Sequence, residues 1–126
     1  MRVLVTGALG NVGFSAVKAC LAAGHEVVMF DRLTQKTQGK ARLLRKWLST
    51  TDRLRWIQGD LLAPDSLDAA LLAFDGRGPD AVIHLAAILP PLSESHPELA
   101  TTINVDGTRL LLDACTTLQP RPAIVY

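Results

Sequence analysis

Short apolar runs alternate along the chain with segments in which apolar residues recur at helical spacing. The runs predict five strands, at residues 3–5, 26–30, 54–59, 81–86 and 123–126. Residues 81–86 are nearly all apolar, which is typical of a parallel strand covered on both faces. The intervening segments predict helices at residues 12–23, 64–74 and 95–118, with a polar loop and a short surface helix within residues 32–49.

Residues with special backbone or capping chemistry mark the ends of these helices. Gly24 follows the first helix as a stop signal, and the glycine-rich residues 76–79 close the helix that begins at Pro64. Ser95 and Glu98 have the spacing of a capping box, so we expect Ser95 to cap the last helix. A proline-containing segment then ends that helix.

Alternation of strands and helices with short connections predicts a doubly wound α/β fold. The expected sheet is parallel, with strand order 3-2-1-4-5 and right-handed crossovers. The chain has 126 residues, of which 48% are hydrophobic and 20% are charged, enough for one domain with a real core. In such a sheet, ligands bind where the carboxyl ends of the first and fourth strands diverge. One crevice should therefore collect residues 7–13, 31, 60–61 and 85–88.

The segment Thr6–Gly13, TGALGNVG, links the first strand to the first helix and predicts a phosphate-binding turn. Gly7, Gly10 and Gly13 lack the Cβ atoms that would keep the backbone away from a pyrophosphate. The helix that opens near Asn11 offers free N–H groups and the positive end of its dipole. The alternative is an ordinary turn, because the spacing is G-x-x-G-x-x-G rather than the more familiar G-x-G-x-x-G.

Asp31 follows the second strand, close to the roughly 20-residue offset from the last glycine that is expected of a ribose-binding carboxylate. It can accept two hydrogen bonds from ribose hydroxyl groups and would repel a 2′-phosphate. The neighbouring Arg32, with Lys36 nearby, would instead attract such a phosphate. We therefore expect NAD as the cofactor and keep NADP as the alternative. The plainer interpretation of Asp31 is a solvated carboxylate at a strand end.

Residues after the third and fourth strands complete the expected crevice. Asp60 is placed to accept a hydrogen bond from an adenine amino group, and Leu61 follows it. Ala86 and Ala87 are small enough for a ribose or nicotinamide to lie against the backbone. The alternatives are that Asp60 only caps the turn after it, and that the two alanines only permit close helix packing.

Asn104 shares one helix face with Gly107, Thr108 and Leu111, and Leu111 suggests that this face is turned inward. A buried amide left unpaired costs on the order of 1 to 3 kcal/mol, so Asn104 needs a backbone partner or an ordered water near the cofactor. We favour a cofactor-site role over a purely structural one. Gly107 inside a helix predicts close packing of another backbone against it.

The histidines and cysteines predict no metal site and no disulfide. Cys20 and Cys115 each fall inside a predicted helix among apolar neighbours, as reduced core thiols do. His25 and His96 are expected at helix caps, and His84 as a hydrogen-bonded residue of a buried strand. Their spacing forms no metal-binding set.

The charge and hydropathy patterns exclude two classes of partner. The formal net charge is +1 and charges of both signs are interspersed, so the chain lacks the basic field that nucleic-acid binding needs. No segment resembles a signal peptide, and no apolar run approaches the roughly 20 residues that span a bilayer. We therefore expect a cytoplasmic protein with no nucleic-acid or membrane partner.

Five motifs together carry a resemblance to a known family. They are TGALGNVG, Asp31, Gly59-Asp60-Leu61, His84-Leu85-Ala86-Ala87 and Asn104-Val105-Asp106-Gly107-Thr108. In this order they resemble the extended short-chain dehydrogenase/reductase family, in its NAD-dependent epimerase/dehydratase group, and imply a Rossmann-type fold. The resemblance assigns the pyrophosphate to Asn11 and Val12, the adenosine ribose to Asp31, the adenine to Asp60 and Leu61, and the nicotinamide-side ribose to Leu85, Ala86, Ala87 and Ile88. It also matches Asn104 to the family's active-site asparagine.

The resemblance also implies which chemistry lies outside these residues. Family members use a serine soon after the fifth strand and a Tyr-x-x-x-Lys pair on the next helix, while nicotinamide takes or gives a hydride. Those positions lie beyond Tyr126, which itself belongs to the predicted fifth strand. We therefore expect residues 1–126 to be an incomplete dinucleotide-binding domain, without a catalytic residue of its own and inactive alone.

The expected parent enzyme transfers hydride at a hydroxyl or keto carbon of a small molecule. We expect its substrate to be a nucleotide sugar or a related metabolite. A homodimer is compatible with the resemblance. The alternative is a cofactor-sensing module of the same fold that binds the dinucleotide without turnover.

Overall fold

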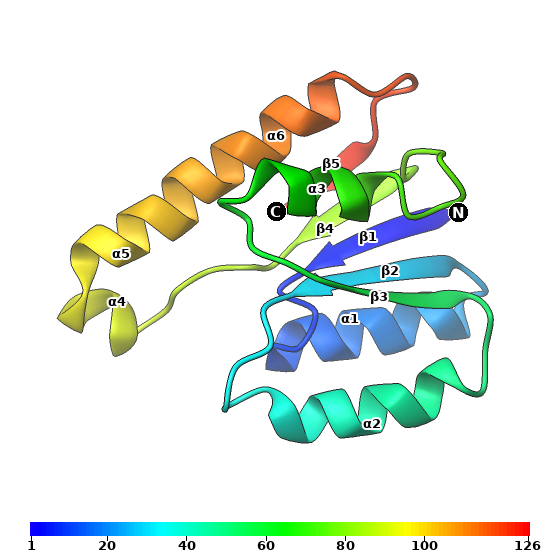
Figure 1. Cartoon of the computed structure of the whole chain (residues 1–126), viewed down its shortest axis with the longest axis horizontal. Coiled ribbons are helices and arrows are strands. Elements are labelled where there is room, and N and C mark those ends of the chain that lie inside the picture. Colours follow the sequence, from blue (N-terminus) through cyan, green and yellow to red (C-terminus); the bar gives the residue numbers. More distant parts are fainter.

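Five parallel strands form one sheet with the order β3-β2-β1-β4-β5 (Figure 1). The strands are β1 Arg2–Thr6, β2 Glu26–Asp31, β3 Leu54–Gln58, β4 Ala81–His84 and β5 Ala123–Val125. This computed structural model describes the backbone of residues 1–126 and the side chains of residues 1–40 and 42–126. The strand order and the parallel pairing confirm the predicted doubly wound fold.

Helices cover both faces of the sheet. The helices of the chain are α1 Asn11–Ala22, α2 Gln38–Leu48, α3 Pro64–Leu71, α4 Leu92–Ser95, α5 Pro97–Thr101, the π-helix η1 Thr102–Gly107 and α6 Thr108–Thr116. In Figure 1, α1 and α2 lie on one face, and α3 and α6 lie on the other. Within the part of the chain that the structure describes, no helix is long and apolar enough to cross a membrane.

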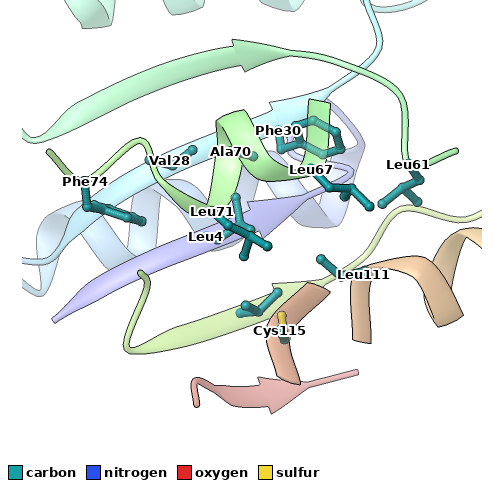
Figure 2. Packing of buried hydrophobic residues seen from close by; sticks show 11 residues of the cluster. Leu4, Val28, Phe30, Leu61, Leu67, Ala70, Leu71, Phe74, Leu111 and Cys115 are labelled. Atoms are coloured by element: carbon teal, nitrogen blue, oxygen red, sulfur yellow. The ribbon is translucent and has the colours of Figure 1, made fainter. Parts of the chain in front are cut away.

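Alternate residues of the central strands supply two apolar cores, because successive side chains of a strand point to opposite faces. Leu4 of β1 and Phe30 of β2 face α3 and α6, where they join a cluster that includes Leu67 and Leu111 (Figure 2). On the other face, Val5 of β1 packs in a cluster with residues of α1 and α2. The inner strands β1 and β2 are therefore buried on both faces, as their nearly continuous apolar runs predict, whereas the edge strand β5 is exposed.

An aromatic stack joins the two helices of the second core. Phe14 of α1 and Trp47 of α2 lie with ring centroids 4.7 Å apart and ring planes inclined by 14°. Both rings pack against the cluster that contains Val17 and Leu44. This contact places α2 beside the start of α1, and so beside the glycine turn.

The end of α1 follows the prediction. Gly24 adopts a φ of +84°, and its N–H group donates to the Leu21 carbonyl at 3.0 Å. The next N–H group, of His25, donates to the Cys20 carbonyl at 3.0 Å. This pair of bonds is a Schellman motif, which confirms the stop at Gly24 and the capping place of His25.

Two predicted elements end earlier than their apolar patterns do. β4 ends at His84, so Leu85 and Ala86 lie in the loop that follows the strand. α3 ends at Leu71, yet Phe74 is only 1% exposed and packs into the core from the turn beyond the helix. Hydrophobic patterns report burial, whereas backbone hydrogen bonds set the ends of an element, and here the two differ.

The predicted capping box at Ser95 is wrong. Ser95 is the last residue of α4, and its hydroxyl group lies 3.2 Å from the carbonyl oxygens of Pro91 and Leu92. His96 has φ −137° and ψ 67° and precedes Pro97, the first residue of α5. A proline disfavours helical backbone at the residue before it, so the helix breaks there. The predicted helix over 95–118 is therefore divided into the end of α4 and the succession α5, η1 and α6.

Candidate functional site

The turn after β1 depends on the missing side chain of Gly7. This residue adopts a φ of +65°, and a Cβ atom on it would lie 2.6 Å from the Ala86 nitrogen and the Leu85 carbonyl carbon. Both neighbours are backbone atoms, so neither can move aside as a flexible side chain would. The glycine turn therefore rests directly on the backbone that follows β4.

The other glycines of the turn bring β1 close to the start of α1. The Gly10 N–H group donates to the Gly7 carbonyl at 2.9 Å, and a Cβ atom on Gly13 would overlap that carbonyl oxygen. The Phe14 N–H group donates to the Gly10 carbonyl at 2.9 Å. The N–H groups of residues 11–13 precede that helical bond, so they and the helix dipole are available to an anion.

Two adjoining cavities open beside the glycine turn, with volumes of about 410 Å³ and 640 Å³. They share a backbone partition formed by Gly7, Gly10, Leu85, Ala86 and Ala87. The first cavity is also lined by Asp31, Arg32, Asp60, Leu61 and Ile88. The second is also lined by Asn11, Val12, Gly13 and Asn104. The fold thus gathers every residue that the sequence predicts to contact the cofactor.

Asp31 lies at the end of β2 with its carboxylate oriented by two backbone groups. The Leu9 N–H group donates to its Oδ2 at 2.7 Å, and the Arg32 N–H group donates to its Oδ1 at 2.7 Å. Burial raises the pKa of the Asp31 carboxyl above its usual value, against the opposing effect of these hydrogen bonds. The side chain is half-buried and fixed in place, not a freely solvated strand-end carboxylate.

Asp60 makes the turn-capping contact that was its plainer expected role. Its Oδ1 accepts a hydrogen bond from the Leu62 N–H group at 3.0 Å. Its Oδ2 lies 3.5 Å from Nη1 of Arg32, an ion pair that the sequence did not predict. Arg32 follows β2 and Asp60 follows the neighbouring strand β3, and both line the first cavity. A contact of Asp60 with adenine stays a prediction.

Asn104 holds the loop after β4 through its side-chain amide. Its Oδ1 accepts from the Ile88 N–H group at 2.7 Å, and its Nδ2 donates to the Ile88 carbonyl at 2.9 Å. These bonds are the structural backbone contact that was the less favoured of its two expected roles. Because Asn104 also lines the second cavity, its contact with a cofactor stays a prediction.

The helix face that carries Asn104 is turned inward, as predicted. Leu111 is fully buried, and a Cβ atom on Gly107 would lie 3.2 Å from Cβ of Leu61. The group that Gly107 accommodates is therefore the Leu61 side chain rather than a second backbone. Thr108 lies on the same face, and its Oγ1 is hydrogen-bonded to His84 Nε2 at 2.9 Å.

Ala86 and Ala87 lie in the partition between the cavities. The Ala86 N–H group lies 3.3 Å from Oγ1 of Thr6, and its side chain packs against the core below. Ala87 is exposed and lines both cavities. The close approach at this point is to the glycine turn rather than to a helix, because Gly7 is the residue that touches the Ala86 backbone.

Sequence reasoning missed several residues around the site. Thr34 and Thr37 line the first cavity, and Thr37 Oγ1 accepts from the Thr34 N–H group at 2.8 Å. Lys40 of α2 donates from Nζ to Oδ1 of Asn11 at 2.6 Å. The polar loop after Asp31 was a usable signal for the threonines. The contact of Lys40 with Asn11 depends on how α2 packs beside α1, and no local sequence pattern predicts that packing.

Comparison with known proteins connects this geometry to a family. The family model described as the NAD dependent epimerase/dehydratase family matches residues 3–126. The chain belongs to this family. The match therefore confirms the resemblance that the five sequence motifs carry. Separately, among the described side chains no group of three or more His, Cys, Asp or Glu is placed to hold a metal ion.

Relatives in the epimerase/dehydratase family differ in chemistry. The chain is 36% identical over 115 residues to UDP-glucose 4-epimerase of Mycolicibacterium smegmatis, covering 90% of this chain and 34% of that protein. It is 30% identical over 131 residues to D-erythronate dehydrogenase of Cupriavidus necator, covering 100% of this chain and 38% of that protein. The chain thus spans little more than a third of the length of these relatives.

A solved family structure shares the fold. UDP-glucose 4-epimerase of Thermus thermophilus, determined in complex with NAD, superimposes with a TM-score of 0.72 and 29% sequence identity. The superposition covers 93% of this chain and 34% of that chain. It confirms the Rossmann-type architecture that the family resemblance implies.

Proposed function

We propose that residues 1–126 form the NAD-binding domain of an epimerase/dehydratase-type oxidoreductase. The observation that carries this proposal is the pair of cavities that meet at the backbone partition. A dinucleotide consists of two nucleosides joined by a pyrophosphate, so it matches two chambers on either side of an anion-binding turn. The space that Gly7 and Gly13 leave, with the N–H groups of residues 11–13, fits the pyrophosphate.

The adenosine half is assigned to the first cavity and the nicotinamide half to the second. Asp31 presents a carboxylate at the first cavity for the ribose hydroxyls, with Asp60 and Leu61 beside the adenine. The second cavity is lined by Asn104, which we assign to the nicotinamide side. The partition residues lie between the two halves and support the nicotinamide-side ribose, whereas Ile88, which was also expected at that ribose, lines only the first cavity.

The charges around Asp31 favour NAD over NADP. The two oxygens of Asp31 retain lone pairs for ribose hydroxyls, and their negative charge repels a 2′-phosphate. The cation that would attract that phosphate, Arg32, lies 3.5 Å from the Asp60 carboxylate, which offsets its charge. Titration of the intact protein with both cofactors tests the ranking, and clearly tighter NADP binding would show that it is wrong.

The reaction we propose is reversible hydride transfer at a hydroxyl or keto carbon, with a nucleotide sugar as the substrate class. NAD supplies the hydride acceptor when it is bound. The residues of this chain bind and orient the cofactor, while proton transfer belongs to the serine and the Tyr-x-x-x-Lys pair expected further along the parent protein. The nucleotide-sugar epimerases among the relatives support this substrate class.

A turnover assay on the intact parent protein tests the proposal. We expect epimerisation or oxidation of a UDP-sugar in the presence of NAD, and loss of that activity when the downstream tyrosine is changed to phenylalanine. A parent protein that binds NAD but has neither the tyrosine nor the lysine, and turns over no sugar nucleotide, would instead be a cofactor-sensing module.

A further inference from the structure

A chain of hydrogen bonds between side chains runs along the second cavity, whose lining includes His84 and Thr108, and the proposed function does not use it. Thr6 at the end of β1 and His84 at the end of β4 are 0% and 4% exposed, and Thr6 Oγ1 lies 2.6 Å from His84 Nδ1. His84 Nε2 lies 2.9 Å from Oγ1 of Thr108, and the Thr108 hydroxyl donates to the Asn104 carbonyl at 2.7 Å. These hydrogen bonds thus join β1 and β4 to the helical segment that carries Asn104.

The hydrogen bonds of Thr108 determine where one imidazole proton of His84 lies. The backbone carbonyl of Asn104 can only accept, so the single hydroxyl proton of Thr108 is directed toward it. The Thr108 oxygen must then act as an acceptor toward His84. His84 Nε2 therefore carries a proton and donates it to this hydrogen bond.

The end at Thr6 gives the same answer independently. The N–H groups of Leu85 and Ala86 lie 3.2 Å and 3.3 Å from Thr6 Oγ1 and supply donors to its lone pairs. The hydroxyl proton of Thr6 is left to point at His84 Nδ1, which must accept it. Both ends specify a neutral imidazole with its proton on Nε2.

A second proton on the imidazole would break this chain. Nδ1 would become a donor facing an oxygen that already receives two N–H groups, and the Thr6 hydroxyl proton would lose its acceptor. Burial also lowers the pKa of His84 from its usual 6.5. The phenol ring of Tyr126, just after β5, faces the imidazole at 5.9 Å between centroids. Among the described side chains, no carboxylate forms an ion pair with His84 that would stabilise the charged form.

We propose that His84 is a positioning residue for the dinucleotide site, holding the backbone partition against the glycine turn through Thr6. This inference rests on the proposed function and adds a nearly buried residue in the wall of the second cavity. Thr6 precedes Gly7, and its hydroxyl group gathers the Leu85 and Ala86 N–H groups on which Gly7 packs. Through Thr108, the same imidazole supports the backbone of Asn104, whose side chain holds Ile88.

Two substitutions separate the halves of the chain. In His84→Asn, the amide oxygen stands near the place of Nδ1 and can accept from Thr6, while the bond to Thr108 is lost. In His84→Gln, the amide stands near the place of Nε2 and can reach Thr108, while the bond to Thr6 is lost. Each variant loses one hydrogen bond, but only the bond to Thr6 supports the Leu85 and Ala86 backbone. We therefore expect His84→Asn to bind NAD within about threefold of the natural protein and His84→Gln to bind roughly tenfold more weakly.

The decisive readout is the pH dependence of cofactor affinity in the intact protein. NAD affinity of the natural protein should fall as the pH drops below the usual histidine range, because the imidazolium disrupts these hydrogen bonds. Burial also raises the pKa of the Asp31 carboxyl, so protonation of Asp31 lowers the affinity in both proteins, and His84→Asn should show the smaller fall. His96→Asn, at an exposed histidine outside the chain, is the matched control and should show the full fall. Nitrogen NMR of the natural protein should show a protonated Nε2 and an unprotonated Nδ1 at neutral pH.

The possible results distinguish a failure of the proposed function from a failure of the positioning role of His84. A protein that binds neither NAD nor NADP at any pH overturns the proposed function, and the positioning role with it. Equal NAD affinities and equal pH profiles for the natural protein, His84→Asn and His84→Gln overturn the positioning role alone, as does a proton found on Nδ1. If His84→Gln does not fold, the pH profiles of the natural protein and His84→Asn, together with the nitrogen NMR of the natural protein, decide the positioning role.

Discussion

At the glycine turn, single atoms decide whether β1, α1 and the loop after β4 can meet. A Cβ atom on Gly7 would collide with the Leu85 and Ala86 backbone, and one on Gly13 would collide with the Gly7 carbonyl. The sequence spacing predicts a close backbone approach at these glycines. It does not say what approaches, because the contact with Leu85 and Ala86 joins residues almost eighty positions apart.

Gly13→Ala tests the packing at this turn. We expect it to lower the free energy of unfolding by about 1–3 kcal/mol, since the added methyl group meets a backbone oxygen that cannot yield. Chemical denaturation measures the change. The control is Gly39→Ala on α2, where an added Cβ has no neighbour within 4 Å; it should raise stability by about 0.5–1 kcal/mol. Equal effects of the two substitutions would contradict the packing account.

Asp31→Asn tests the carboxylate at the ribose position. We expect the affinity for NAD to fall roughly tenfold or more, because charge-assisted hydrogen bonds to the ribose are lost. The ratio of NADP to NAD affinity should rise, since the charge that repels a 2′-phosphate is removed. Calorimetric titration with both cofactors measures this, and Asp52→Asn, at an exposed carboxylate outside both cavities, should leave the affinities unchanged.

At the scale of elements, the helical region after Pro97 shows what periodicity can and cannot predict. The inward face of Asn104, Gly107 and Leu111 follows from spacing alone and is confirmed. The π-helix η1 within it does not follow, because widening by one residue leaves an apolar pattern nearly unchanged over so short a segment. The break at His96 was also missed, since a capping-box spacing takes no account of the backbone that Pro97 imposes.

Asn104→Leu tests the connection between this helix and the loop after β4. We expect the free energy of unfolding to fall by about 1–3 kcal/mol, because the Ile88 N–H and carbonyl groups lose their partners. Urea denaturation measures the change. Val105→Ala on the neighbouring residue, whose side chain is 54% exposed, should change stability by less than about 0.5 kcal/mol. A similar loss in both variants would argue against the amide contact as the cause.

At the scale of the whole molecule, strand order and layer arrangement were the most predictable properties. Five apolar strands separated by helical segments leave few arrangements once crossovers must be right-handed. The ion pair of Arg32 with Asp60 and the bond from Lys40 to Asn11 were not predictable. Long polar side chains reach partners on other elements, and the final distances depend on how those elements pack.

The acid stability of the molecule should depend on a contact at the amino ends of the strands, whereas the cavities lie at their carboxyl ends. Arg2, at the start of β1, forms a 2.5 Å ion pair with Asp80, just before β4. The hydrogen bond from the Arg2 side chain, followed by that from its N–H group, lowers the pKa of the Asp80 carboxyl from 3.8 to about 2. Its contribution to stability is therefore fully present above the unfolded pKa and is lost as the pH falls through about 2.

Asp80→Asn makes this pH dependence measurable. The natural protein should be more stable than the variant near neutral pH, and the difference should shrink steadily between about pH 4 and pH 2. Denaturation curves collected across that range give the difference directly. In an Arg2→Met background the same substitution should show much less pH dependence, whereas an unchanged dependence would assign the effect to another group.

The partition between the two cavities has a consequence for how this domain can diversify. The spacing between the chambers is set by main-chain atoms of Gly7, Leu85 and Ala86, while each chamber takes its character from side chains on separate loops. Substitutions on the loop after β2 can change the first chamber, whereas η1 contributes Ile103 to the first chamber and Asn104 to the second. We therefore expect substitutions of these side chains to change what each chamber binds while the main-chain contact between the chambers is kept.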